Sequence, residues 1–427
     1  MDAQPVSLPA YWRLIRSNRN FRLLWGAQMV SEIGDWLYAV SIYSLLLELT
    51  GSAQSVAAAV VLQLLPQFFF APIAGVVNDR ISRRTVMIAA DLVRAAVVAC
   101  MILVQTREMV PLLYVLLFCE TVMWAFFEPG RTATIPNVTR DKGETVVANA
   151  LSSLTWSFNL AFGATVGGVV AVLFGRNTVF VINAGSFLVS ALFLRRLKID
   201  EPHTVGSKPL RMADLADFSP IREGLAYVLS NRRLFATLLV KAGLGLLGAH
   251  WVILPIFGER IFPLSVEQLG AGRAGMLGMS LLLGSRGIGA MLGPIAGGYW
   301  AGRSEARLRL GIVAGFCCVA LGYTALSAAG SIWTACASVV LAHAGGSMIW
   351  VFSTTLLHYQ TEDRFRGRVF SADFSFMVLT MSIITFLAGT AVDLGISVRT
   401  ISLLTGVIAL VPATLWILAL RLWREDR

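Results

Sequence analysis

A small set of ionisable residues lies inside long apolar stretches of the sequence, where charged side chains are rare unless they have a function. Placing such a residue at the depth of a lipid bilayer costs at least about 2.5–3.5 kcal/mol, so its side chain is expected to face a cavity, an ion-pair partner or a pathway. We therefore predict that these residues contact a substrate or carry a proton. The set comprises Glu32, Asp35, Asp91, Arg94, Glu120, Lys241 and Arg286.

Two pairs in this set are three residues apart, which puts both members on one helical face. Glu32 and Asp35 form the first pair. Two adjacent carboxylates do not both ionise readily, which suits a site that takes up and releases a proton. The alternative for Asp35 is a cap or a pair with a neighbouring helix. Asp91 and Arg94 form the second pair, for which a local ion pair or a role in coupling is expected.

Each of the remaining three residues has more than one possible role. Glu120 is either a cavity residue or a partner of Arg94 from another helix. Lys241 and Arg286 are the buried bases of the second half of the chain. Apart from Arg94, the first half supplies buried acids and the second half buried bases, which predicts a central cavity with one wall of each sign. An amphipathic or zwitterionic substrate could use both walls, or the walls could pair when the cavity closes.

Composition indicates that lipid is the solvent. Hydrophobic residues make up 56% of the chain and charged residues 14%, against about 25% charged in soluble domains. The net charge of +10 is spread over short clusters between apolar runs, which excludes nucleic acid as a partner. The five cysteines lie in apolar runs without CxxC spacing, and His250 and His343 are isolated, so neither a metal nor another cofactor is predicted. Motifs such as GxxxxGK[ST], HExxH and GxSxG do not occur, which argues against an enzyme.

The apolar runs predict an all-α membrane protein with twelve transmembrane helices, because about 20 apolar residues span a bilayer and only helices satisfy their own backbone there. The first run is too long for a signal peptide. Most of the 35 Lys and Arg residues fall in alternate connections, which predicts that both termini are cytoplasmic. The predicted spans are 21–47, 54–77, 85–106, 109–128, 146–172, 176–197, 233–257, 272–300, 308–329, 332–356, 369–392 and 397–420.

The order of the spans predicts four parts. Residues 1–20 form a cytoplasmic N-terminal segment, and residues 21–197 form a first six-helix bundle. Residues 198–232 form a cytoplasmic linker with an amphipathic helix near 221–229, and residues 233–423 form a second six-helix bundle.

A repeated turn motif links the two halves. Gly75, Asp79 and Arg80 follow the second span, and Gly298, Gly302 and Arg303 stand at the matching place in the second half. Gly130-Arg131 is likewise echoed by Gly367-Arg368. Matching halves with Gly, Asp and Arg at their turns are typical of a transporter built from parallel repeats.

On these residues the chain resembles the major facilitator superfamily. The run Gly75…Asp79-Arg80…Arg83-Arg84 is similar to the motif of that family's loop between spans two and three, apart from Ser82 in place of Gly. Segments 31–36, 127–136 and 183–187 resemble the drug:proton antiporter subgroup that contains macrolide efflux proteins and the enterobactin exporter. The resemblance implies that a cytoplasmic charge cluster latches the two bundles, whereas simple anchoring by positive charge is the alternative. The implied gating residues are Gly75, Asp79, Arg80, Arg83, Arg84, Glu128 and Arg131.

The expected function is therefore secondary active transport across the bacterial cell (inner) membrane. We expect a proton-coupled exporter of an apolar or amphipathic small molecule that works by alternating access. The alternative is an exporter or flippase of an anionic siderophore or lysophospholipid, with Lys241 and Arg286 binding the anion. The expected partners are the small-molecule substrate, the proton and membrane lipid, and the chain is expected to be a monomer. The chain departs from the pattern of related proton-coupled exporters in two places. The predicted fifth span lacks the proline of the antiporter signature near Gly163, and the predicted fourth span carries Glu120 where many relatives have Arg. Sequence motifs therefore do not by themselves establish proton coupling.

Overall fold

The computed structural model describes residues 7–201, 219–264, 271–302, 304–362 and 365–425. All regular elements in those ranges are helices, and eleven of the helices are long and apolar enough to cross a membrane. Arg303 of the predicted repeat and residues 202–218 of the predicted linker lie outside the described residues. The helices belong to two compact units, and each is described by itself.

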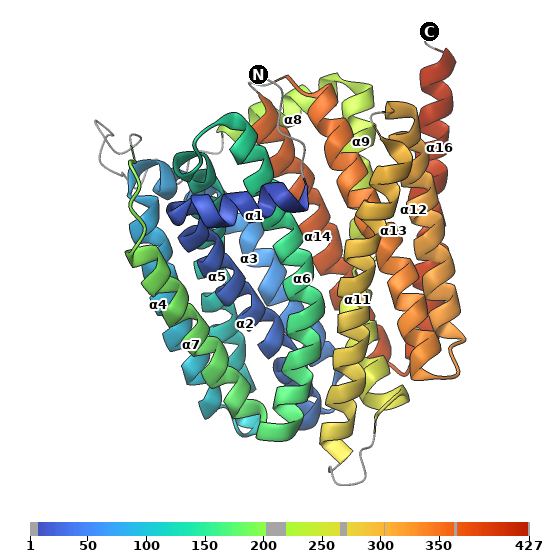
Figure 1. The fold of residues 1–427 in the computed structure, drawn as a ribbon. Helices are drawn as coiled ribbons and strands as arrows, with labels where there is room; N and C mark the ends of the chain where they lie inside the picture. The colour runs from blue at the N-terminus through green and yellow to red at the C-terminus, as the bar shows by residue number, and fades with distance from the viewer. Residues whose placement is uncertain (1–6, 202–218, 265–270, 303, 363–364, 426–427) are drawn as a thin grey trace. The chain divides into compact units, whose positions relative to one another are not determined.

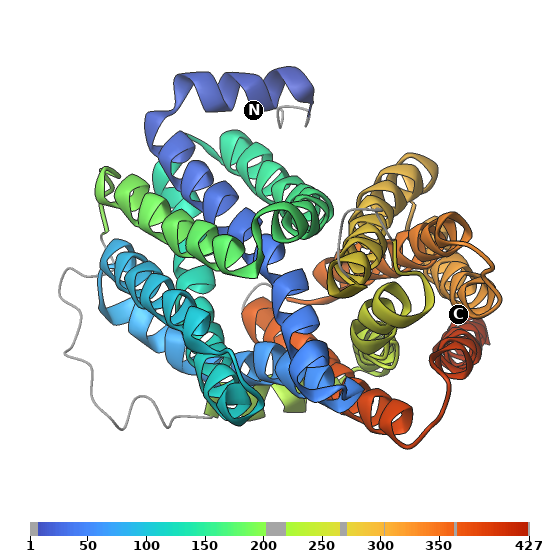
Figure 2. The same cartoon turned by 90° about the horizontal axis from the view of Figure 1, so that it is seen from below.

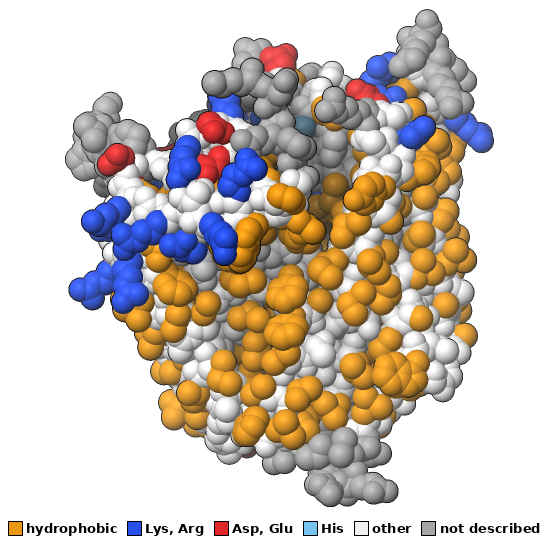
Figure 3. Space-filling view, viewed as in Figure 1, with side chains coloured by type: hydrophobic (Ala, Val, Ile, Leu, Met, Phe, Trp, Pro, Cys, Tyr) orange, Lys and Arg blue, Asp and Glu red, His pale blue; other side chains and the backbone are white. Residues whose placement is uncertain are grey.

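Unit 1 comprises residues 1–42 and 66–216. A short helix at its start carries Trp12 on an exposed face and leads into long helices (Figure 1). Lys and Arg side chains gather at the end of this unit that carries the short helix, and hydrophobic side chains cover the flank beyond it (Figure 3). The elements are α1 (Leu8–Ser17), α2 (Arg19–Thr50), α3 (Ala53–Arg80), α4 (Arg83–Cys100), η1 (Met101–Leu103), η2 (Arg107–Met109), α5 (Val110–Val138), α6 (Lys142–Phe174) and α7 (Arg176–Arg195).

Unit 2 comprises residues 43–65 and 217–427, and so takes in the end of α2 and the start of α3. A helix is present where the linker was predicted to be amphipathic. The other elements are α8 (Ser219–Ser230), α9 (Arg232–Gly245), α10 (His250–Ile256), η5 (Phe257–Ile261), α11 (Ala271–Ala301), α12 (Glu305–Ser327), α13 (Ile332–Gln360), α14 (Arg366–Asp393), α15 (Val398–Ile408) and α16 (Leu410–Glu425).

The predicted spans coincide with these helices, but α2 does not meet the criteria for a membrane-spanning helix. Helix α2 is 32 residues long, enough to cross a bilayer, but it is not among the eleven helices that qualify by length and composition. The count of twelve spans and the cytoplasmic position of the termini therefore stay predictions. The all-helical membrane architecture itself is confirmed.

Short polar side chains decide where several helices begin. Ser82 starts α4 by accepting a hydrogen bond from the Thr85 backbone N–H at 3.3 Å. Asn231 starts α9 by accepting from the backbone N–H groups of Arg233 and Leu234, both at 3.1 Å. Such caps satisfy backbone donors that the first helical turn leaves open, and each stabilises a helix by about 0.5–2 kcal/mol.

The predicted span 233–257 is interrupted, because α9 gives way to a turn before α10 and the π-helical η5. Gly248 lies in this turn, and a Cβ atom there would lie 2.5 Å from the Met381 carbonyl oxygen of α14. The Thr385 hydroxyl also donates to the Gly248 carbonyl at 2.9 Å. The close approach that only glycine permits therefore seats this span against α14.

A hairpin made of the end of α2 and the start of α3, residues 43–65, packs on α14 inside unit 2 (Figure 2). Asp393, the last residue of α14, accepts hydrogen bonds from the Ser52 hydroxyl, from the Ala53 N–H at 2.8 Å and from the Gln54 N–H at 3.1 Å. The carboxylate thus caps α3 from a helix about 340 residues away in sequence. We call residues 43–65 the outer hairpin.

Candidate functional site

One guanidinium in unit 1 is surrounded by three carboxylates from three helices. Arg94 on α4 donates to Asp35 on α2 at 2.6 Å and to Glu120 on α5 at 2.8 Å. Asp91, one turn earlier on α4, lies 3.8 Å from the same guanidinium. The Arg94 side chain is 1% exposed and its guanidinium carbon lies 4.1 Å from the centre of the Phe187 ring. We call these four ionisable residues the Arg94 cluster.

The charges of the Arg94 cluster do not balance if every group is ionised. One guanidinium would then face three buried carboxylates, and a buried charge without compensation is strongly destabilising. Binding a proton on one of the acids removes part of this excess. Asp35 is the most accessible of the three, with a side chain 21% exposed against 7% for Glu120. Asp35 is therefore the carboxylate of the cluster that water reaches most readily.

The sequence-based alternatives for this cluster can now be compared with the contacts. The pairing of Glu120 with Arg94 is present, and the Tyr38 hydroxyl adds a contact to Glu120 at 3.4 Å. The local pair of Asp91 with Arg94 is present too, but at 3.8 Å it is the longest of the three contacts. Arg94 is thus shared between helices and is not neutralised within its own helix.

Glu32 belongs to a second network nearer the end of unit 1 that carries α1. Its carboxylate accepts from the Gln28 amide at 2.9 Å and from the Asn159 amide of α6 at 3.2 Å. The Gln28 amide oxygen in turn accepts from Arg131 of α5 at 2.9 Å. Arg131 completes the network by pairing with Glu128 at 2.5 Å. The network therefore connects a predicted proton-site residue to two predicted gating residues.

Spacing along α2 places the two networks next to each other. Gln28, Glu32, Asp35 and Tyr38 follow at intervals of four, three and three residues, which is the repeat of one helical face. Glu32 contacts the network of Arg131, and Asp35 contacts the Arg94 cluster. The described contacts of the two carboxylates run to different partners, so the predicted pair acts as a junction between networks.

The remaining residues of the predicted gating motif make contacts within unit 1. Arg83 donates to the Ala133 carbonyl of α5 at 2.8 Å and lies 3.6 Å from Asp79, whose side chain is 73% exposed. Arg84 donates to the Leu197 carbonyl, after the end of α7, at 2.9 Å. Arg80 also has an interaction partner. A Cβ atom at Gly75 would meet no atom within 4 Å, so packing inside the described residues does not require glycine there.

In unit 2, Lys241 of α9 forms a buried ion pair with Asp373 of α14. The Lys241 ammonium also lies 4.4 Å from the centre of the Trp350 ring. Asp373 is fully buried, and the prediction that the second half supplies only buried bases is therefore wrong. The signal was present in the sequence, since Asp373 is an acid inside the apolar run 369–392 and meets the same criterion as Asp91.

Arg286 of α11 lies in an aromatic environment in unit 2. Its guanidinium carbon is 3.9 Å from the centre of the Trp251 ring, close enough for a cation–π interaction. The His250 ring beside Trp251 meets the His343 ring at a centroid distance of 5.0 Å. The Tyr323 hydroxyl lies 3.0 Å from His343 Nε2. The two histidines, expected as isolated core residues, thus form one cluster, while the described residues contain no group of His, Cys, Asp and Glu that could hold a metal ion.

Comparison with known proteins places these features in a family context. The model of the Major Facilitator Superfamily matches residues 24–372. Macrolide efflux protein A of Streptococcus pyogenes is 27% identical over 231 residues, which cover 54% of this chain and 55% of that protein. The MFS-type transporter YfiS of Bacillus subtilis (strain 168), described as uncharacterized, is 27% identical over 217 residues, or 50% of each chain. These alignments span about half the length of the curated relatives.

Solved structures show a similar fold. The crystal structure of the nucleoside transporter NupG superposes with a TM-score of 0.70 at 12% identity, covering 94% of this chain and 98% of that one. At this level of identity the likeness concerns the fold alone.

Proposed function

The chain belongs to the Major Facilitator Superfamily, and from this premise we propose that it exports an apolar or amphipathic small molecule from a bacterial cell in exchange for protons. The eleven apolar helices and the bacterial relatives make it a multi-pass protein of the bacterial cell membrane. The observation that carries the proposal is the Arg94 cluster, in which three carboxylates share one buried guanidinium.

Proton exchange at Asp35 supplies a physical basis for coupling. When Asp35 is ionised, its bond to Arg94 ties α2 to α4, and protonation weakens that bond. A proton that binds one conformation better than another shifts the equilibrium between them. Glu32, one helical turn away, connects this change to Gln28 and then to Arg131. In this mechanism the proton at Asp35 alters the stability of the cytoplasmic charge network.

Alternating access needs a contact that opens on the opposite side of the membrane, and the outer hairpin is our candidate. Its contacts with α14 include the three hydrogen bonds to Asp393 and one from Thr390 to Gln54 at 3.0 Å. A Cβ atom at Gly389 would lie 2.5 Å from the Ala57 Cβ, so the two helices touch closely. Polar contacts at helix ends can break and reform in water, which suits a contact that opens in each cycle.

For the cargo, we infer that an apolar or aromatic surface is recognised near Arg286. The guanidinium of Arg286, the indole of Trp251 and the rings of the histidine cluster are flat groups, on which an apolar or aromatic cargo can stack. The name of one relative, macrolide efflux protein A, makes a macrolide the first cargo to test. An anionic siderophore or lysophospholipid remains the second candidate, favoured by the positive charge of Arg286, whereas Lys241 is already paired with Asp373.

The test measures accumulation of radiolabelled erythromycin in everted membrane vesicles with an imposed pH gradient, acidic inside. Wild-type vesicles should accumulate the label, and a protonophore should abolish the accumulation. Asp35→Asn should lose gradient-driven accumulation but retain exchange of labelled for unlabelled cargo, because exchange needs no net proton movement. Glu108→Gln, an exposed acid outside the cluster, is the matched control and should behave as wild type.

Two outcomes decide against the proposal. Transport that is independent of both the gradient and Asp35 would contradict proton coupling. If the same vesicles do not carry erythromycin but do carry a labelled catecholate, the anionic alternative replaces the proposed apolar or amphipathic cargo. In that case Arg286→Gln should abolish transport of the catecholate.

A further inference from the structure

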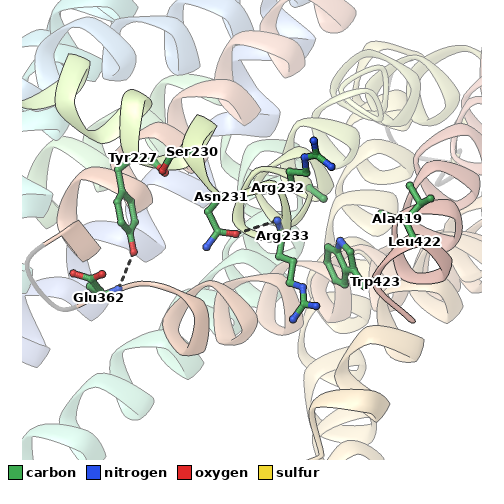
Figure 4. A pocket seen from close by; sticks show the side chains of 10 residues that line it. Tyr227, Ser230, Asn231, Arg232, Arg233, Glu362, Ala419, Leu422 and Trp423 are labelled. Carbon is green, nitrogen blue, oxygen red and sulfur yellow. Dashed lines mark hydrogen bonds between the residues drawn. The ribbon is translucent and has the colours of Figure 1, made fainter. Parts of the chain in front are cut away.

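A cavity of about 660 Å³ opens at one end of unit 2, between α8, the start of α9 and the end of α16 (Figure 4). Its lining residues belong to unit 2, whereas the Arg94 cluster belongs to unit 1. The proposed transport mechanism does not use this cavity. Arg232 and Arg233 lie on one side of the cavity with Trp423, and Tyr227 and Glu362 lie on the other side. The lining therefore carries two positive charges and one negative charge.

Aromatic packing organises the basic side of the cavity. The Trp423 ring meets the Trp416 ring edge-on at a centroid distance of 5.4 Å, and Trp416 donates to the Arg309 carbonyl at 3.0 Å. The guanidinium carbon of Arg233 is 6.0 Å from the centre of the Trp423 ring and that of Arg309 is 5.6 Å from it. Trp423 is 8% exposed and so provides a fixed surface against which a guanidinium can be held.

The opposite side of the cavity is held by other contacts. The Tyr227 ring stacks on Phe365 at a centroid distance of 4.1 Å, and its hydroxyl accepts from the Glu362 N–H at 3.4 Å. The Asn231 amide oxygen is used by the cap of α9, which leaves its NH₂ group as the end that can donate to a ligand. The two walls are thus built from different helices.

The position of the cavity along the spans points to a lipid. Arg232 begins one membrane-spanning stretch, Arg232–Ile261, and Trp423 ends another, Val398–Trp423. Tryptophan and arginine at the ends of spans lie at the level of lipid headgroups. Apolar residues of the same two helices continue from the cavity into the span, including Ala236, Ala419 and Leu422, which is 62% exposed. A molecule with a charged head and an apolar tail fits this order of groups.

We propose that this cavity binds the headgroup of an anionic phospholipid, with the phosphate at Arg232 and Arg233. Basic pockets between transmembrane helices on the cytoplasmic side of a membrane bind such headgroups. The net positive lining favours an anionic over a zwitterionic lipid. Phosphatidylglycerol is anionic and phosphatidylethanolamine is zwitterionic, so these two lipids distinguish the two cases.

The test measures lipid binding to the purified full-length protein by native mass spectrometry and by thermal shift in detergent. Phosphatidylglycerol is compared with phosphatidylethanolamine and with inorganic phosphate. The variants are Arg232→Gln/Arg233→Gln and Trp423→Leu. The matched control is Arg421→Gln, an exposed arginine on α16 outside the lining.

Phosphatidylglycerol should bind wild type more tightly than phosphatidylethanolamine and raise its melting temperature. Each arginine near a membrane surface contributes about fivefold to binding of an anionic lipid, so the double variant should bind about thirtyfold more weakly. Trp423→Leu should weaken binding as well, and Arg421→Gln should not. Equal binding of the two lipids, or a double variant that binds as wild type does, would overturn the proposal. An equal effect of inorganic phosphate alone would assign the site to a free anion and reject the lipid.

Discussion

Arg131 and Glu32 are hydrogen-bonded to the same side chain, the amide of Gln28. The amide oxygen accepts from Arg131 and the amide NH₂ donates to Glu32, both at 2.9 Å. Gln28 is 1% exposed, so the link is shielded from water, where hydrogen bonds compete with solvent. A side chain that can donate and accept at once is required at this position, because its two neighbours carry opposite charges.

Replacing Gln28 should separate the two networks. Gln28→Leu removes these two hydrogen bonds and a third, which the Gln28 amide donates to the Ser152 carbonyl at 3.1 Å. It leaves buried polar groups unsatisfied, at about 1–3 kcal/mol each. Gln28→Glu keeps an acceptor for Arg131 but loses the donor to Glu32. Both variants should lower the number of protons moved per cargo molecule, measured with a pH-sensitive dye in proteoliposomes, and Gln28→Glu should be the more stable. Unchanged stoichiometry in both would show that the networks are not coupled through this amide.

Removing the guanidinium of the Arg94 cluster should be more damaging than neutralising an acid. Arg94→Gln leaves three buried carboxylates without their cation, and breaking a buried pair in this way costs about 3–5 kcal/mol. The expected result is a large fall in melting temperature in detergent. Adding Asp35→Asn and Glu120→Gln to Arg94→Gln should recover part of the loss. A triple variant no more stable than Arg94→Gln would contradict the electrostatic explanation.

The pair of Lys241 and Asp373 should show strong coupling in a double-mutant cycle. Either Lys241→Met or Asp373→Leu alone leaves one buried charge and should cost about 3–5 kcal/mol. The double variant should be close to wild type in stability, because an apolar pair of similar volume avoids the desolvation cost. Melting temperatures of the four proteins give the coupling energy. Additive effects would mean that the two side chains do not interact in the membrane.

Cross-linking the outer hairpin should stop transport if the hairpin separates from α14 in each cycle. Gln54→Cys and Thr390→Cys place two thiols where a hydrogen bond now spans 3.0 Å. Oxidation should block erythromycin transport, and reduction should restore it. The control pair, Thr139→Cys and Thr145→Cys, replaces two hydroxyls 2.6 Å apart within unit 1 and should leave transport intact when oxidised. The five native cysteines are replaced beforehand so that they do not react. Full transport by the oxidised outer pair would exclude this opening.

The predicted topology can be checked by labelling single cysteines in intact cells. Arg83→Cys and Arg368→Cys should be protected from a membrane-impermeant maleimide, because both are predicted to face the cytoplasm. Arg107→Cys and Arg399→Cys should react, since both belong to predicted outer connections. Labelling of Arg83→Cys or Arg368→Cys from outside would reverse the predicted orientation.

The helical architecture could be predicted from the sequence, because hydrophobicity is a local property of the chain. The run predicted at 176–197 is the helix Arg176–Arg195, and the run predicted at 332–356 begins at the first residue of Ile332–Gln360. Apolar stretches of this length can only be helices in lipid, and no knowledge of their neighbours is needed to find them. The free-energy cost of placing a charge in lipid likewise indicated Asp35, Arg94 and Glu120 as candidate functional residues.

Contacts between these groups depend on how the helices pack against one another, and sequence spacing does not report that packing. The guanidinium of Arg94 reaches three carboxylates on three helices, and sequence spacing reports contacts within one helix only. For the same reason, sequence spacing did not indicate the role of Gln28, whose charged partners Arg131 and Glu32 lie 103 and 4 residues away. Nor did it indicate the role of Asp393, which caps a helix from the other half of the chain. The break after α9 depends on how closely Gly248 approaches α14, which is a property of packing between helices.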